Sequence, residues 1–150
     1  MKKLALPVRL GIAISGCLIA FFLILSLFGL HTNPIFSLFN GVITGLGIYE
    51  AIRYNKLEQS EDFTYASGFS VGLITGFLAT LIFTVFFLFY ATEVDALFLS
   101  KLLEVFEGKY NVSVGLVTFV VAIMGFATTV ILTLTCMQIF KKSRNIPQNA

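Results

Sequence analysis

Few side chains in this sequence could do chemistry inside a membrane, and the clearest pair is Glu50 with Arg53. On a helix, residues at i and i+3 lie on one face, so these two can form an ion pair. Ionisable groups within an apolar helix are candidates for function by default. Here, however, both stand about one turn from the predicted end of their helix, where charged side chains can reach water. We therefore favour a structural ion pair over a functional site.

The remaining reactive residue types are scattered. His31 is the only histidine and falls in a predicted turn, where a solvated imidazole is a simpler interpretation than a ligand or a catalytic base. A metal site usually needs three or four clustered ligands, and the sequence contains no such cluster. It also lacks a phosphate-binding glycine loop and a nucleophile elbow. We expect no enzyme, no metal and no cofactor. A lipid-acting enzyme is a distant alternative, because Glu50 and His31 are predicted to lie on opposite sides of the membrane.

Uncharged polar residues are the other candidates. Asn40 is expected to bond to nearby backbone or across helices. A polar pathway built from Asn40 and the span-four threonines is the alternative. Without charged groups near the midplane, an ion-coupled transporter is not favoured. The threonines in question are Thr118, Thr128, Thr129, Thr133 and Thr135.

The elements that must position these residues are apolar helices. Hydrophobic residues make up 57% of the chain and charged residues 12%, whereas soluble domains carry about 25% charged residues. The long, continuous apolar runs favour helices over barrel strands. We predict an all-α membrane protein, a four-helix transmembrane bundle, as a single domain of residues 1–150. The predicted spans are about 9–30, 35–52, 66–91 and 112–140.

Two connections between these spans are polar. Residues 53–62 are predicted to form a loop. Residues 96–108 predict a short amphipathic helix between spans three and four, started by Asp95 and ended by Gly108. Such a helix can lie in the headgroup region. It either caps the bundle or binds a partner.

The distribution of positive charge predicts the orientation. Eight of the ten Lys and Arg residues fall at the two termini or between spans two and three, which leaves only Lys101 and Lys109 on the other side. Because Lys and Arg concentrate in cytoplasmic segments, we expect both termini in the cytoplasm of a bacterial cell, with the protein in its cytoplasmic membrane. The net charge of +2 is too small to indicate nucleic acid binding.

The first span also resembles a secretion signal, because Ile14-Ser15-Gly16-Cys17 is similar to the lipobox of bacterial lipoproteins. A lipoprotein normally turns polar after that cysteine, but Leu18 to Phe22 continue the apolar run. We therefore favour an uncleaved membrane anchor.

Small residues predict how the helices pack. Gly68, Gly72 and Gly76 recur at every fourth position and share one face of span three. Gly41 and Gly45 form a second pair of this kind in span two, and span four repeats the spacing with Gly125, Thr129 and Thr133. Such patterns let helix backbones approach closely in lipid. We expect packing within the bundle, with a homodimer face as the alternative.

The stretch Phe63-Thr64-Tyr65-Ala66-Ser67-Gly68-Phe69-Ser70-Val71-Gly72, the acidic segment 94–107 and the basic end after span four resemble a bacterial family. That family consists of small four-span membrane proteins with a domain of unknown function. The resemblance implies the fold and supplies no activity. We expect a non-enzymatic structural or accessory protein that contacts the lipid bilayer and binds a second copy or another membrane protein. The alternative is a subunit of a small oligomeric transporter or channel.

Overall fold

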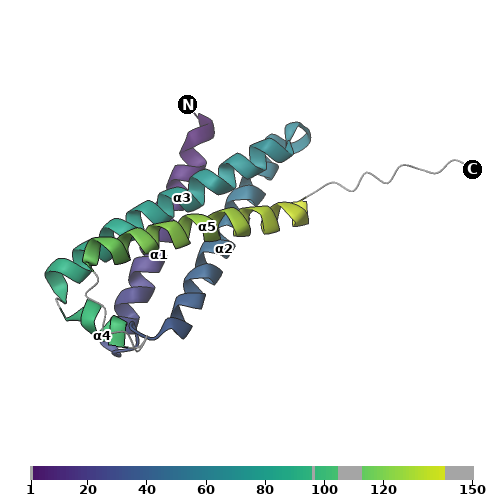
Figure 1. The fold of residues 1–150 in the computed structure, drawn as a ribbon. Coiled ribbons are helices and arrows are strands. Elements are labelled where there is room, and N and C mark those ends of the chain that lie inside the picture. The colour runs from purple at the N-terminus through teal and green to yellow at the C-terminus, as the bar shows by residue number, and fades with distance from the viewer. Residues whose placement is uncertain (1, 96, 105–112, 141–150) are drawn as a thin grey trace, which may run out of the picture.

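The fold consists of helices only within residues 2–95, 97–104 and 113–140, which the computed structural model describes (Figure 1). Four long helices are apolar enough to cross a membrane, which confirms the predicted fold class. They are α1 (Lys2–Leu27), α2 (Pro34–Gln59), α3 (Tyr65–Phe89) and α5 (Val114–Phe140). Three short elements join them: η1 (Ser60–Asp62), η2 (Tyr90–Val94) and α4 (Phe98–Glu104).

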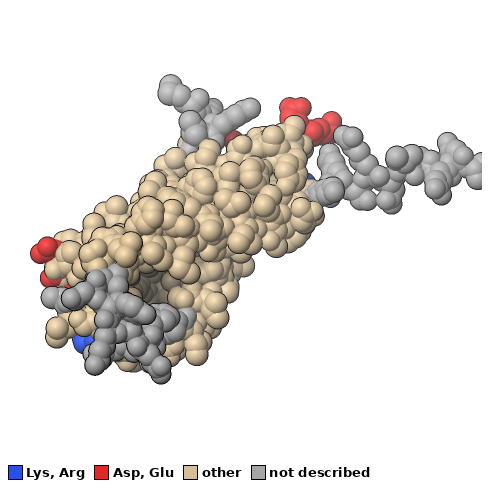
Figure 2. Space-filling model, in the orientation of Figure 1, with Lys and Arg blue, Asp and Glu red and all other residues tan. Residues whose placement is uncertain are grey.

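The helices run up and down, so the elements divide between two ends of the bundle (Figure 1). The start of α1, the α2–α3 connection and the last turn of α5 lie at one end, which we call the terminal end. The α1–α2 turn, η2 and α4 lie at the other, the α4 end. On the face shown in Figure 2, the visible charged side chains lie at these two ends and the surface between them carries none. This uncharged band is what contact with lipid acyl chains requires.

Helix α3 is the centre of the bundle, because its contacts with the other three long helices are the most extensive. From α1 it receives Ile14 and Leu18, which pack on Ala79. Their four-residue spacing puts both side chains on one face of α1. In the most apolar 18-residue stretch of α3, 39% of the residues are buried, whereas in that of α5 only 11% are. Helix α5 therefore leaves most of its surface to the surrounding lipid.

The helix ends differ from the predicted ones. Helix α1 begins at Lys2 instead of residue 9 and includes Pro7 in its second turn. Helix α2 continues to Gln59, so the loop predicted over residues 53–62 is wrong; most of it is helix and the remainder is η1. The segment contains Arg, Lys, Leu, Glu and Gln, which favour helix in water, so the helix does not need to end with its apolar run.

At the α4 end, the chain leaves α3 through the π-helical turn η2, where the Asp95 amide donates to the Tyr90 carbonyl over 3.1 Å. The Asp95 carboxylate then accepts from the Leu97 amide over 3.1 Å, just before α4 begins. Helix α4 is amphipathic over its described side chains: Phe98 is 1% exposed, and Ser100 and Lys101 face outward. The rest of the helix predicted over 96–108, with Gly108, lies outside the described residues.

Candidate functional site

The predicted ion pair forms on the surface of α2. The Arg53 guanidinium donates to both carboxylate oxygens of Glu50, with Nη1 at 3.1 Å from Oε1 and 3.3 Å from Oε2. The two side chains are 54% and 40% exposed, respectively. Exposed pairs of this kind contribute about 0–1 kcal/mol to stability. The geometry is that of a local i,i+3 pair on the helix surface.

Replacing Glu50 by glutamine should therefore lower the free energy of unfolding by about 1 kcal/mol or less. The glutamine keeps a side-chain oxygen for Arg53 and loses only the charge. Thermal unfolding in detergent would measure the change. A loss well above that range would contradict a surface pair and reopen a functional role for Glu50.

The other candidates on α2 have few contacts with described residues. The Asn40 Oδ1 atom is buried without a hydrogen-bond partner among the described groups, so the bond predicted for it does not form there. A Cβ built on Gly41 meets no heavy atom within 4 Å. A Cβ on Gly45 would lie 3.4 Å from a Leu132 methyl, an ordinary contact. The close helix contact of α2 lies instead at Gly47, which was not among the predicted packing glycines. A Cβ built on Gly47 would collide with the Ile14 side chain of α1.

The glycines of α3, by contrast, all face α5. A Cβ on Gly68 would lie 2.8 Å from the Met137 sulfur, and one on Gly72 would lie 2.6 Å from the Thr133 methyl. Gly76 faces Thr129 in the same way. Each step of four residues forward on α3 matches a step of four backward on α5. Two antiparallel helices thus fit small residues on one against threonines on the other, as close packing in lipid requires.

At the next position along the contact the glycine is on α5 and the threonine is on α3, because Gly125 faces Thr80. We call these contacts the glycine–threonine seam, consisting of Gly72, Gly76, Thr80, Gly125, Thr129 and Thr133. The Thr129 and Thr133 side chains are fully buried, at 0% exposure. Their hydroxyl oxygens lie against glycine backbone, where Cα–H groups can act as weak donors.

Several buried hydroxyls lack a conventional hydrogen bond. The Oγ1 atoms of Thr75, Thr118, Thr129 and Thr133 have no hydrogen-bond partner among the described residues. Bonds to backbone or across helices were expected for the span-four threonines, and Thr135 does donate to the Ile131 carbonyl over 2.8 Å. An unpaired buried hydroxyl costs free energy. At these positions threonine therefore costs more than an apolar side chain of the same shape would.

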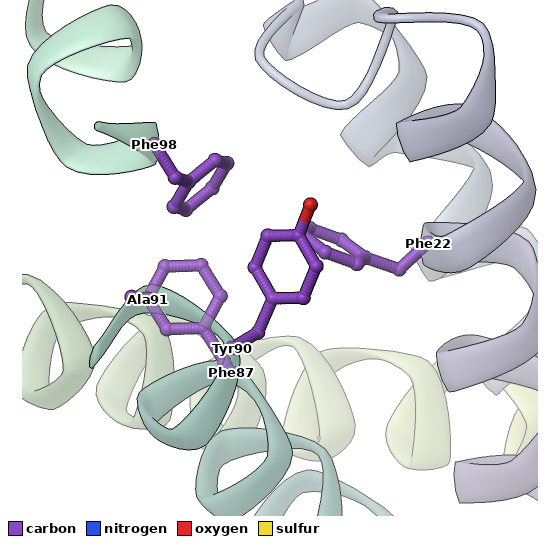
Figure 3. Packing of buried hydrophobic residues seen from close by; sticks show 5 residues of the cluster. All are labelled: Phe22, Phe87, Tyr90, Ala91 and Phe98. Atoms are coloured by element: carbon purple, nitrogen blue, oxygen red, sulfur yellow. The ribbon is translucent and has the colours of Figure 1, made fainter. Parts of the chain in front are cut away.

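The α4 end contains an aromatic cluster that sequence reasoning missed (Figure 3). Phe22 of α1 lies at its centre, with edge-to-face contacts to Phe87, Tyr90 and Phe98 at ring distances of 6.4, 4.9 and 5.9 Å. The Tyr90 hydroxyl lies 2.6 Å from the Ser26 hydroxyl. The cluster thus joins α1, α3, η2 and α4 at one place.

His31 belongs to this cluster. Its imidazole stacks on the Phe98 ring at 5.1 Å and 16°, and meets Phe22 and Tyr90 at 5.7 and 6.0 Å. Both ring nitrogens are buried without a hydrogen-bond partner among the described groups. Burial lowers the pKa of His31, while the nearby Asp95 carboxylate raises it and Lys101 lowers it. The solvated imidazole predicted for the turn is therefore wrong.

A second polar arrangement lies at the terminal end, within the segment predicted as a loop. Asn55, Gln59 and Ser67 form a closed ring of three hydrogen bonds, each 2.9 Å long. A cavity of about 280 Å³ beside it is lined by Asn55, Glu58, Gln59 and Asp62. Asn55 is 5% exposed. Because Asn55 and Gln59 belong to α2 and Ser67 belongs to α3, these hydrogen bonds connect the end of α2 to the start of α3.

These arrangements include no metal centre within the described part of the chain, where no three His, Cys, Asp or Glu side chains come together. No protein-family model, no curated protein and no solved structure matches the sequence or the fold. The resemblance to the small four-span bacterial family stays a prediction.

Proposed function

We propose that this chain is a non-enzymatic structural or accessory component of a membrane, acting through its helix surfaces and the α4 end. The observation that carries the proposal is the glycine–threonine seam, which fills the space between α3 and α5 with matched small residues. Among the described side chains, no Asp, Glu, Lys or Arg is buried. Close packing without reactive groups fits a scaffold better than a catalyst.

We further propose that the membrane is the bacterial cytoplasmic membrane and that both termini lie in the cytoplasm. The support is the excess of Lys and Arg in the segments of the terminal end.

A second copy of the chain or another membrane protein is the proposed partner. Large apolar side chains are exposed on α5, among them Phe119, Met124 and Ile131. They provide an apolar surface on which such a partner can pack in place of lipid.

One observation favours a second candidate, a subunit of a small transporter or channel. The hydroxyls of Thr75, Thr129 and Thr133 and the Asn40 side-chain oxygen are buried without a hydrogen-bond partner among the residues that the structure describes. Unpaired buried polar groups are unusual and call for a reason, such as water or a solute that visits them. A hydrated path along the seam would provide those partners.

Flux across liposomes separates the two candidates. Vesicles containing the purified chain should pass ions and small polar solutes no faster than empty vesicles. A Thr129→Val variant removes the buried hydroxyl and keeps the side-chain shape. Thr135→Val is the matched control, because the Thr135 hydroxyl is exposed and bonded within α5. Selective flux that Thr129→Val abolishes and Thr135→Val preserves would refute the accessory role and establish transport.

A further inference from the structure

Helix α4 contacts the bundle through Phe98, its most buried described side chain, and through Leu102, which packs against the same aromatic cluster. Phe98 is 1% exposed and packs against Phe22, Phe87 and Tyr90, whereas Ser100 and Lys101 of the same helix face outward. One face of the Phe98 ring is covered by the His31 imidazole, which stacks on it at 5.1 Å. A movement of the His31 side chain therefore removes one of the contacts that hold Phe98, and with it α4, against the bundle.

We propose that His31 is a pH-dependent latch for α4, closed when the imidazole is neutral and released when it is protonated. The proposal goes beyond the accessory role and does not depend on it. Both imidazole nitrogens are buried and unpaired among the described groups. A neutral ring leaves one N–H group and one acceptor nitrogen unpaired here, whereas an imidazolium leaves two N–H groups and a positive charge unpaired. The charged form therefore costs more in this position and gains partners by moving toward water.

The described groups that face His31 do not supply those partners. From α1 comes Phe22, which carries no charge. From η2 comes Tyr90, whose hydroxyl is paired with the Ser26 hydroxyl at 2.6 Å. Within the described part of the chain, the charged groups near His31 are Asp95, just before α4, and Lys101 within it. These two form an ion pair with each other, Nζ to Oδ2 at 3.3 Å. Their effects on the pKa of His31 thus oppose each other, and burial of the ring remains the largest cause of the lowered pKa.

The direction of the pH dependence follows from these contacts. Burial lowers the pKa of His31 in the closed latch, so the closed state binds fewer protons than the open one. The closed state is then fully favoured above the ordinary histidine pKa of about 6.5 and weakens as the pH falls below it. Each unit by which the pKa is lowered changes the ratio of closed to open latch by about tenfold. The Phe98 ring face attracts an imidazolium and opposes part of this shift.

The first test measures the titration of His31 itself. It is the only histidine in the chain, so a histidine-labelled full-length sample in detergent micelles gives one NMR signal to follow. The midpoint should lie below about 6.5. Asp95→Asn should move the midpoint further down while keeping an oxygen for the Leu97 amide, and Lys101→Gln should move it up. A midpoint at or above the ordinary value would overturn the proposal.

The second test measures whether α4 comes loose. The chain has no tryptophan, so Phe98→Trp supplies a single fluorescent reporter that still fills the aromatic site. Its emission should shift to longer wavelength, and its quenching by iodide should rise, as the pH is lowered from about 7.5 to 5. The matched variant Phe98→Trp with His31→Phe keeps the ring stack and should show no change. The same pH response in that variant would overturn the latch.

Hydrogen exchange covers the case in which the tryptophan variant does not fold. The backbone amides of residues 97–104 in the unaltered chain should exchange faster at low pH, after correction for the intrinsic rate. The His31→Phe chain should not show this acceleration. Equal acceleration in both chains, or none in either, would refute the proposal.

Discussion

Replacing Gly72 by leucine is expected to prevent the folded bundle from forming. The first side-chain carbon alone would lie 2.6 Å from the Thr133 methyl and 3.3 Å from an Ile52 methyl. Because those neighbours belong to α5 and α2, the helices must separate. Overpacking costs about 1–3 kcal/mol even for added methylenes in a well-packed interior, and separation also breaks the Gly76–Thr129 contact. The yield of monodisperse protein in detergent should fall sharply.

Gly41→Leu is the matched control, because its Cβ meets no heavy atom within 4 Å. It should change stability by about 0.5 kcal/mol or less. A compensating pair sharpens the test further: Gly72→Ala with Thr133→Ala removes the methyl that the new carbon would meet. The double variant should be more stable than the sum of the single changes predicts, by about 0.5–3 kcal/mol. If Gly72→Leu folds as well as Gly41→Leu, the seam does not hold α3 against α5.

The Gly41→Leu chain also tests the homodimer alternative. An open small-residue face on α2 is where a second copy could approach. If this substitution leaves the fold intact but lowers the oligomeric mass in detergent, Gly41 lies in an interface between copies. An unchanged mass excludes that face.

The seam shows what the sequence can predict for this chain. Glycines at every fourth position determine which face of α3 carries small residues. The same spacing in α5 places a small residue or threonine opposite each of them along the contact. Helix period and short-range spacing determine both patterns. The identity of the partner helix, however, depends on how the helices are arranged around α3, which spacing does not encode. Gly41 has the same kind of spacing with Gly45 and yet meets nothing within 4 Å.

Boundaries outside the apolar runs were harder to predict. Hydropathy shows where lipid ends, but a helix ends where its backbone bonding or capping ends. Helix α2 therefore continues for about two turns beyond its predicted end, and its last residues are held by side chains. Gln59 bonds to Ser67 of the next helix. That bond is visible only once α2 and α3 are paired in space.

His31 and its neighbours illustrate the same limit at the other end of the molecule. A histidine between two apolar segments has the local features of a solvated turn residue. Its burial comes from Phe22, Tyr90 and Phe98, which belong to three other elements and are brought together by the fold. The amphipathic helix predicted over 96–108 includes Phe98, but its pattern does not show that the Phe98 ring covers the imidazole.

The substitution Phe22→Ala is expected to be the most destabilising change at the α4 end. Phe22 is 7% exposed and joins His31 to the aromatic rings of α3, η2 and α4. Removing a buried phenylalanine costs about 3–5 kcal/mol in water-soluble proteins. The low end applies here, because lipid solvates apolar surface and leaves packing as the main term.

Phe119→Ala is the control that separates packing from lost hydrophobicity. Phe119 is the same residue type within α5, but it is 61% exposed to the surroundings of the bundle. Thermal unfolding in one detergent should show a loss of about 3 kcal/mol for Phe22→Ala and about 0.5 kcal/mol or less for Phe119→Ala. Hydrogen exchange should rise in α4 only for the first. Equal losses would mean that the lost hydrophobicity of the side chain, and not the contacts around Phe22, accounts for the effect, and α4 would then need another anchor.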